Sequence, residues 1–359
     1  MDTLHQLEHT LHNLASPKRA HTFWGLLAVL AVCAGLIWLK HGEWLAKPNE
    51  NMLGASPDGI KNYMTSLWHV RHDSGYVHYE GMNYPFGEHV LFTDNQPLLS
   101  AAMQWWSRHV SSLDGKTVSV INVFQVISLL LGCAVLFLLL RKLHVPVWYA
   151  GVVSLGMLFL SPQNSRFDGH FALSHTWVFP LLLLLLVNYE ERYSRRYQSL
   201  LIGILMWVAA QFHFYYFGLS ALFLTLYTGF QLIRDFSPRN WRVRLSHLAV
   251  MILFPFVLLN IWLHWSDYVT DRPANPYGFT HYLGQWEGVL LPYESFPLYQ
   301  WIDKNIVPIR RVNGETQAYA GILTLFFTLW YIVLFFKWLL YQLTQKRLFV
   351  RHKIFPPSR

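Results

Sequence analysis

Long apolar runs separated by shorter polar segments dominate the pattern along this chain. Eight of them carry few or no charges, at residues 22–40, 118–140, 146–162, 171–189, 199–212, 213–233, 246–264 and 318–342. Most have the length of about 17–25 residues that a helix needs to cross roughly 30 Å of hydrocarbon. Because lipid cannot satisfy bare backbone groups, these runs must be helices. The pattern predicts an all-α, polytopic transmembrane helix bundle of about eight spans, with residues 1–359 as a single membrane domain and no separate soluble domain.

The polar segments predict how the bundle is oriented. With the N-terminus inside, the inner segments hold 17 Lys and Arg against 5 Asp and Glu, and the outer segments hold 11 against 15. This asymmetry is what the positive-inside rule requires, so both termini are predicted to be cytoplasmic. The sequence pI of about 9.4 then reflects topology, and no nucleic-acid partner is expected.

The fifth and sixth runs test this orientation. Both flanks of residues 199–233 are basic, so the segment should cross the membrane an even number of times and turn back at residues 211–216. Non-helical backbone at that depth must be buried in protein or line a cavity. The alternative is one long tilted helix, which would invert every later segment.

Chemistry-bearing residues gather in two long outer loops, 41–117 and 265–317. In the first, Ser56 is a helix cap and Pro57 suits the first helical position, which predicts an amphipathic surface helix ending near His72. Pro97 opens a second helix that ends near His109. Residues 296–306 predict a further surface helix in the last loop.

Three acids of the first loop each allow two interpretations. Asp58 is either a first-turn acid that favours the helix dipole or a general base that faces a cavity. Glu88, followed by His89, serves either a loop ion pair or the site. Asp94 either caps the helix that begins at Pro97 or belongs to the site.

Basic and aromatic residues supply the remaining candidates for substrate binding. Arg166 and His170, at a short outer turn, either contact a lipid phosphate or form a surface turn with an Arg166–Asp168 pair. His213 and Tyr216 mark the predicted turn within the membrane and either bind a ligand or pack at the interface. In the last loop, Arg310 and Arg311 either clamp a phosphate or face lipid headgroups. Glu315 in the same loop is a further candidate for substrate binding.

Several familiar catalytic signals are absent. The sequence holds no phosphate-cradling glycine loop, no His-Glu-x-x-His zinc motif and no Gly-x-Ser-x-Gly elbow. Cys33 and Cys133 both fall inside apolar runs, so neither a disulfide framework nor a cysteine metal site is expected.

The layout resembles the GT-C superfamily of polytopic membrane glycosyltransferases, which draw sugars from polyprenyl-phosphate carriers. The likeness rests on the inner N-terminus, the two large outer loops and an early acid in Asp58-Gly59-Ile60-Lys61-Asn62-Tyr63. The stretches 83–89, 93–97 and 166–170 are similar to segments of uncharacterised bacterial proteins of this kind. The superfamily often has an adjacent acidic pair where this chain has Asp58 followed by Gly59.

The resemblance implies a reaction and roles for named residues. Asp58 would deprotonate an acceptor hydroxyl, and the sugar would transfer with inversion on the outer face of a bacterial inner membrane. Arg166, His170 or the Arg310–Arg311 pair would hold the departing polyprenyl phosphate. The cofactor is left open, and Glu88 or Asp94 are the candidates to hold a divalent cation such as Mg²⁺ or Mn²⁺.

Two other classes of function remain open at this stage. A transporter or flippase of a lipid-linked or anionic solute would use the same basic and aromatic cavity without chemistry. It should show paired broken helices in repeated halves and ionisable groups in mid-span, whereas the sequence offers one break and almost no such groups. A catalytically silent assembly partner is the third interpretation.

Overall fold

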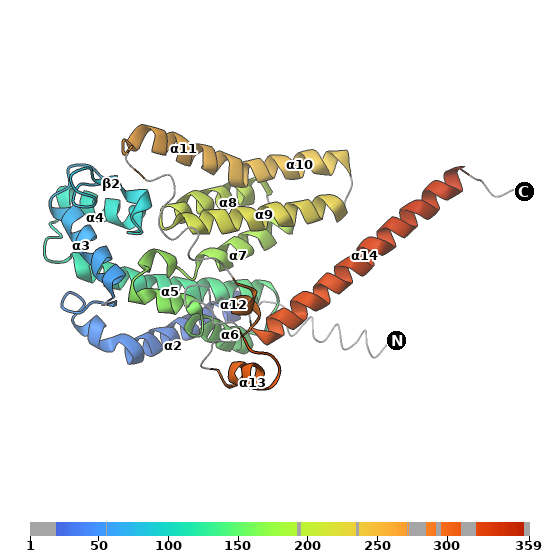
Figure 1. Ribbon diagram of the computed structural model, residues 1–359, viewed down its shortest axis with the longest axis horizontal. Helices are drawn as coiled ribbons and strands as arrows, with labels where there is room; N and C mark the ends of the chain where they lie inside the picture. Colours follow the sequence, from blue (N-terminus) through green and yellow to red (C-terminus); the bar gives the residue numbers. More distant parts are fainter. Residues whose placement is uncertain are drawn as a thin grey trace, which may run out of the picture. The chain divides into compact units, whose positions relative to one another are not determined.

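The computed structural model describes residues 19–54, 56–191, 195–234, 237–270, 272, 285–291, 296–309 and 321–354, and it divides into two units, Met1–Thr270 and Asp271–Arg359. The elements, labelled as in Figure 1, are α2 (Arg19–Ala46), α3 (Pro57–Arg71), β1 (His78–Tyr79), β2 (Glu88–His89), η1 (Val90–Phe92), α4 (Pro97–His109), α5 (Thr117–Lys142), α6 (Val147–Phe159), η2 (Pro162–Asp168), η3 (Phe171–Leu173), α7 (Val178–Glu190), α8 (Arg195–Ala210), α9 (Phe214–Arg234), α10 (Pro238–Leu248), the π-helical η4 (Ala249–Leu253), α11 (Phe254–Ser266), α12 (Trp286–Leu290), α13 (Pro297–Asn305) and α14 (Ile322–Ile354).

The described residues form an α-helical membrane protein. Six helical segments are long and apolar enough to cross a bilayer: Ala20–Ala46, Thr117–Lys142, Phe171–Glu190, Phe214–Arg234, Pro238–Ser266 and Leu323–Tyr341. Two further predicted runs fold as α6 and α8, of 13 and 16 residues. Both fall short of the roughly 20 residues that a span needs, so the length criterion gives six spans where the sequence predicts eight. The helix of α6 ends just before Pro162, which cannot continue a helix.

The helices of the first unit pack as neighbours along the chain. Helix α5 packs against α2, α6 and α7, and α8 packs against α7 and α9. Two apolar cores result, one around Cys33, Cys133 and Phe137 and the other around Ile202, Met206 and Leu224. A third, smaller core around Tyr63 and Phe171 joins the first loop to this bundle.

The predicted break between the fifth and sixth runs is confirmed, and the single long helix is wrong. Helix α8 ends at Ala210 and α9 begins at Phe214. The non-helical backbone between α8 and α9 finds a hydrogen-bond partner within the protein. The Gln211 carbonyl accepts a hydrogen bond of 3.1 Å from the Leu98 amide of α4. Phe212 is buried against the rings of Phe124 and Trp177. Buried irregular backbone of this kind is tolerated within a membrane bundle.

The first loop folds as a compact layer over one end of the bundle. Helices form where the sequence predicts them after Ser56 and from Pro97, as α3 and α4, and within residues 296–306, as α13. Between α3 and α4, β1 pairs with β2 in antiparallel register, His78 opposite His89 and Tyr79 opposite Glu88. Helices α3 and α4 lie at the end of the first unit opposite the α9–α10 connection (Figure 1).

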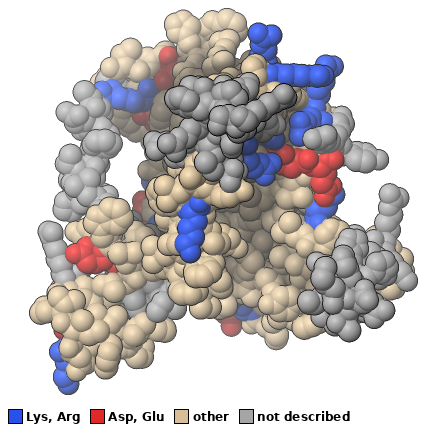
Figure 2. All heavy atoms as spheres, turned by 90° about the vertical axis from the view of Figure 1, so that its right-hand side faces the viewer, with Lys and Arg blue, Asp and Glu red and all other residues tan. Residues whose placement is uncertain are grey.

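The opposite end carries basic residues. Arg141 and Lys142 end α5, Arg195 begins α8, and Arg244 lies in α10. The Arg244 guanidinium binds both Glu190 oxygens, at 2.8 and 3.3 Å, which ties α10 to the end of α7. Figure 2 looks onto this end and shows Lys and Arg side chains on its surface with acidic side chains among them.

Candidate functional site

Two carboxylates, a lysine and two histidines meet where the first loop contacts the bundle. We call these residues the charged cluster: Asp58 and Lys61 of α3, Asp94 before α4, His170 between η2 and η3, and His213 in the break between α8 and α9. The sequence separately predicts four of them as site residues. The structure brings those four together and adds Lys61.

His170 lies between the two carboxylates. Its Nδ1–H donates to Asp94 Oδ2 at 3.0 Å, and its Nε2 lies 3.5 Å from Asp58 Oδ2. Lys61 Nζ is 3.7 Å from Asp58 Oδ1 and 4.0 Å from Asp94 Oδ2. His213 Nδ1 accepts from the Tyr215 amide, so its Nε2–H faces Asp94 Oδ1 at 3.6 Å. Each carboxylate therefore has a lysine and an imidazole beside it.

Local sequence explains why Asp58 and His170 meet. Ser56 caps α3 by accepting from the Gly59 amide at 3.2 Å, and its hydroxyl also donates to the Asp168 carbonyl. The Asn62 amide donates to the Gly169 carbonyl. These two side chains fasten the turn that precedes His170 to the first turns of α3.

Glycines make this close approach possible. A Cβ on Gly54 would lie 2.5 Å from the Asp168 carbonyl oxygen, and a Cβ on Gly59 would lie 2.5 Å from the Gly54 oxygen. Both neighbours are backbone atoms, which cannot swing aside. A side chain at position 59 would therefore force these backbone segments apart.

Asp94 contacts His170 and does not cap α4. The N-terminal cap position of α4 is held by Gln96, with no side-chain capping bond, so the cap interpretation of Asp94 is wrong. Asp94 and Gln96 have φ angles of 60° and 51°. This left-handed backbone, which Asp tolerates better than most residues, turns the chain before the helix.

The two carboxylates differ in exposure, which separates their roles. The Asp58 side chain is 51% exposed and that of Asp94 is 20% exposed. The hydrogen bond to Asp94 raises the pKa of His170, and the nearby Arg166 charge opposes this shift. Burial lowers the pKa of His213. Asp58 is thus the more accessible carboxylate, and Asp94 holds the imidazole beside it.

A buried network of neutral polar groups supports the cluster from below. His175 Nε2–H donates to Gln96 Oε1 at 2.9 Å, and its Nδ1 accepts from the Ser128 hydroxyl at 2.7 Å. The Tyr216 hydroxyl accepts from the His175 amide at 3.0 Å and from Gln163 at 3.3 Å. Tyr216 is therefore buried beneath the cluster and joins α9 to the start of α7.

Other predicted site residues lie elsewhere. Glu88 and His89 belong to the hairpin, where His89 is buried and donates to Ser266 Oγ at 3.0 Å. Its ring packs against Trp262, which fastens the hairpin to α11. Arg166 lies in η2 and forms no ion pair with Asp168, among the residues that the structure describes. Arg310, Arg311 and Glu315 lie outside the described residues.

Two of the functional groups were missed by sequence reasoning. Lys61 was overlooked although it lies one helical turn after Asp58, a spacing that places both on one face of a helix. Gln96 has no local signal, because its hydrogen-bond partner His175 lies 79 residues later in the chain.

The cluster offers poor ligands for a divalent cation. Within the described part of the chain, no group of three or more His, Cys, Asp and Glu is arranged to hold a metal ion. The Lys61 ammonium also lies near both carboxylates, where it competes with a metal for their negative charge.

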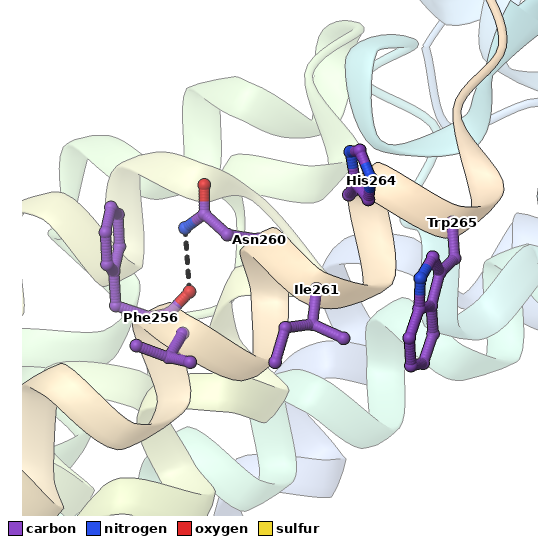
Figure 3. A pocket seen from close by; sticks show the side chains of 6 residues that line it. Phe256, Asn260, Ile261, His264 and Trp265 are labelled. Atoms are coloured by element: carbon purple, nitrogen blue, oxygen red, sulfur yellow. Dashed lines mark hydrogen bonds between the residues drawn. The ribbon is translucent and has the colours of Figure 1, made fainter.

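A hollow on α11 has no carboxylate or lysine in its lining. Its lining residues, Phe256, Val257, Asn260, Ile261, His264 and Trp265, all come from this one helix (Figure 3). The Asn260 amide already donates to the Phe256 carbonyl at 2.8 Å. No carboxylate or lysine lines this hollow, so the charged cluster is the better candidate for chemistry.

Fold and cluster together define the class as a polytopic α-helical membrane protein with a charged site over one end of its bundle. A family described as "Domain of unknown function (DUF6311)" matches residues 22–355. The chain therefore belongs to this family. No curated protein and no solved structure matches this chain.

We expect Gly59→Ala to lower the melting temperature, because the new Cβ meets the Gly54 carbonyl 2.5 Å away. Overpacking of this kind costs about 1–3 kcal/mol. Gly218→Ala is the matched control, a helical glycine whose Cβ would meet nothing within 4 Å. Thermal unfolding in nanodiscs measures both, and equal melting temperatures would show that the glycine contact is unimportant.

His170 should make stability depend on pH. Because its pKa is raised above the ordinary 6.5 in the folded protein, the stabilisation by the protonated ring is complete below pH 6.5. It is lost as pH rises through the folded pKa. We expect the melting-temperature advantage of wild type over His170→Asn to shrink as the pH is raised from 6 to values above the folded pKa of His170. His213 is present in both proteins, so a difference that stays constant over this range would contradict the assignment.

Proposed function

We propose that this protein is a membrane glycosyltransferase that moves a sugar from a polyprenyl-phosphate donor to an acceptor hydroxyl, with Asp58 as general base. The observation that carries this proposal is the accessible Asp58 carboxylate, 3.5 Å from an imidazole that Asp94 orients. A base needs an exposed lone pair within hydrogen-bond reach of a substrate hydroxyl, and Asp58 meets this requirement.

The reaction follows from the residue types of the cluster. Asp58 accepts the proton of the acceptor hydroxyl as that oxygen attacks the anomeric carbon. The bond from this carbon to the phosphate oxygen breaks, and the polyprenyl phosphate leaves with the electron pair. Attack from the face opposite the leaving group inverts the anomeric centre.

Cations beside Asp58 suit the leaving group. Lys61 Nζ lies 3.7 Å from Asp58, and Arg166 is close enough to His170 to affect its protonation. A fixed cation that stabilises charge as it develops on a departing phosphate lowers the barrier. Lys61 and Arg166 are the groups that we assign to this phosphate, together with the protonated form of His170.

We further propose that α6 and α8 also cross the bilayer, which gives eight crossings and places the cluster on the outer face. Support comes from the basic residues at the ends of α5, α8 and α10, opposite the first loop. Basic residues are retained on the cytoplasmic side. The termini are then cytoplasmic, in a bacterial inner membrane.

One observation favours transport as a second candidate. The break between α8 and α9, with the polar network around His175, resembles the broken helices that line transporter sites. Its members Gln96, Gln125 and Ser128 are already hydrogen-bonded to each other or to His175. A satisfied, buried network is a poor solute site, so we prefer the transferase.

Asp58→Asn should reduce sugar transfer by about 10²–10⁴-fold, the usual contribution of a general base. The measurement is release of polyprenyl phosphate from a panel of radiolabelled polyprenyl-phosphate sugars in membranes that contain the full-length protein. Asp114→Asn is the control, since Asp114 pairs with Arg71 in the same loop, away from the cluster. Full activity of the Asp58 variant would refute the base assignment.

Thiol labelling tests the orientation. Cys33 and Cys133 are buried, so single cysteines can report without interference. A membrane-impermeant maleimide applied from outside should label Tyr84→Cys in the hairpin and leave Arg239→Cys at the start of α10 unlabelled until the membrane is opened. The reverse pattern would overturn the outer placement of the cluster.

A further inference from the structure

A second hollow lies along the same face of α3 as Asp58 and Lys61. Residues 58, 61, 65 and 68 recur at intervals of three or four, so their side chains form one stripe. The hollow borders the later part of this stripe, and its lining residues are Met64, Thr65, Trp68, Tyr79, Gly81 and Met82.

The turn that carries Asp94 is fastened to two residues that line this hollow. Asn95 directly follows Asp94, and its amide donates to Thr65 Oγ1 and lies 3.9 Å from Met82 Sδ. A helix rises 1.5 Å per residue, so Thr65 is roughly 10 Å and Trp68 roughly 15 Å from Asp58 along α3. These separations exceed the hydrogen-bond reach of about 3 Å. A group in the hollow is therefore not the group that reacts at Asp58.

The lining suits a ring with apolar faces and hydroxyl edges. Trp68 and Met64 are 45% and 57% exposed, which leaves an indole and a thioether open to a ligand. The half-buried Thr65 places its hydroxyl at the same place, held by the buried Asn95 amide behind it. A Cβ at position 81 would lie 2.6 Å from Trp68 Nε1, so glycine lets the loop approach the indole closely. Apolar pockets with a few placed polar groups are typical of small-molecule sites.

A charged neighbour argues against lipid hydrocarbon in the hollow. Glu80 adjoins Gly81, and its carboxylate accepts from the Ser74 amide and hydroxyl at 3.1 and 2.7 Å. These bonds lower the pKa of Glu80, which keeps it ionised. An ionised carboxylate is strongly disfavoured inside hydrocarbon. The hollow therefore faces the aqueous side of the interface.

We propose that this hollow is an acceptor subsite for a sugar ring at least one unit away from the hydroxyl presented to Asp58. The inference rests on the proposed transferase function and names its acceptor class: an oligosaccharide, or a glycan chain, and not a monosaccharide. Trp68 stacks on the apolar face of that ring, and the Thr65 hydroxyl oxygen accepts a hydrogen bond from one of its hydroxyls.

A glycan array tests the subsite with the full-length protein in nanodiscs. The array carries mono- to pentasaccharides of hexoses, N-acetylhexosamines and uronic acids. Wild type should retain oligosaccharides of at least two units, Trp68→Ala should reduce this retention at least tenfold, and Trp68→Tyr should preserve it. Trp106→Ala is the matched control, an exposed tryptophan of α4 that does not line the hollow. Absence of retention by wild type, or equal retention by Trp68→Ala, would overturn the proposal.

A second variant guards against misfolding and tests the lipid alternative. Met64→Cys provides one accessible thiol, because the native cysteines are buried. The retained glycan should slow its modification at least threefold, and bimane attached there should resist quenching by brominated lipids. Strong quenching would assign the hollow to lipid. Asp58→Asn should still retain glycan, because Asp58 does not line the hollow. If this variant also kept transferase activity, the base assignment would fail while the subsite proposal would stand.

Discussion

The attachment of one short turn to the start of α3 is the constraint on which the rest of the site depends. Ser56 and Asn62 bind the Asp168 and Gly169 carbonyls, and Gly54 and Gly59 leave space for these backbones to touch. Only this approach places the His170 ring beside Asp58. A larger residue at either glycine would separate the segments and leave two ordinary surface acids. The chemistry of the cluster is therefore set by backbone packing.

The sequence predicts the local elements well, because their signals are local. Ser56 and Pro57 mark the start of α3, Pro97 marks that of α4, and the two basic flanks of residues 199–233 require the break before Phe214. The run 146–162 is longer than α6, since the helix ends at Phe159 while Leu160 is still apolar, whereas α8 begins four residues before its predicted run and ends two residues earlier. Apolar composition alone does not reveal where hydrogen bonding stops.

The site itself was predictable only in part. Asp58, Asp94, His170 and His213 were each named, yet the sequence could not show that they meet, since Asp94 and His170 are 76 residues apart. The cap interpretation of Asp94 failed because a carboxylate before a helix has two partners open to it, the helix amides and a distant histidine. Tertiary contact decides between them. Glu88 and His89 carry the same residue types but belong to hairpin packing.

The pairing of an exposed with a shielded carboxylate explains why one cluster can hold two acids with different tasks. In the proposed reaction, two solvent-facing acids would compete for the proton of the acceptor hydroxyl and for His170. Asp94 is less exposed and both histidines contact it, so its oxygens are used within the protein. Asp58 is more exposed and keeps part of its carboxylate open to solvent. The Lys61 ammonium lies near both carboxylates and so reduces the repulsion between their negative charges. In the reaction that we propose, Asp58 is thereby free to meet an acceptor hydroxyl while its neighbours remain fixed.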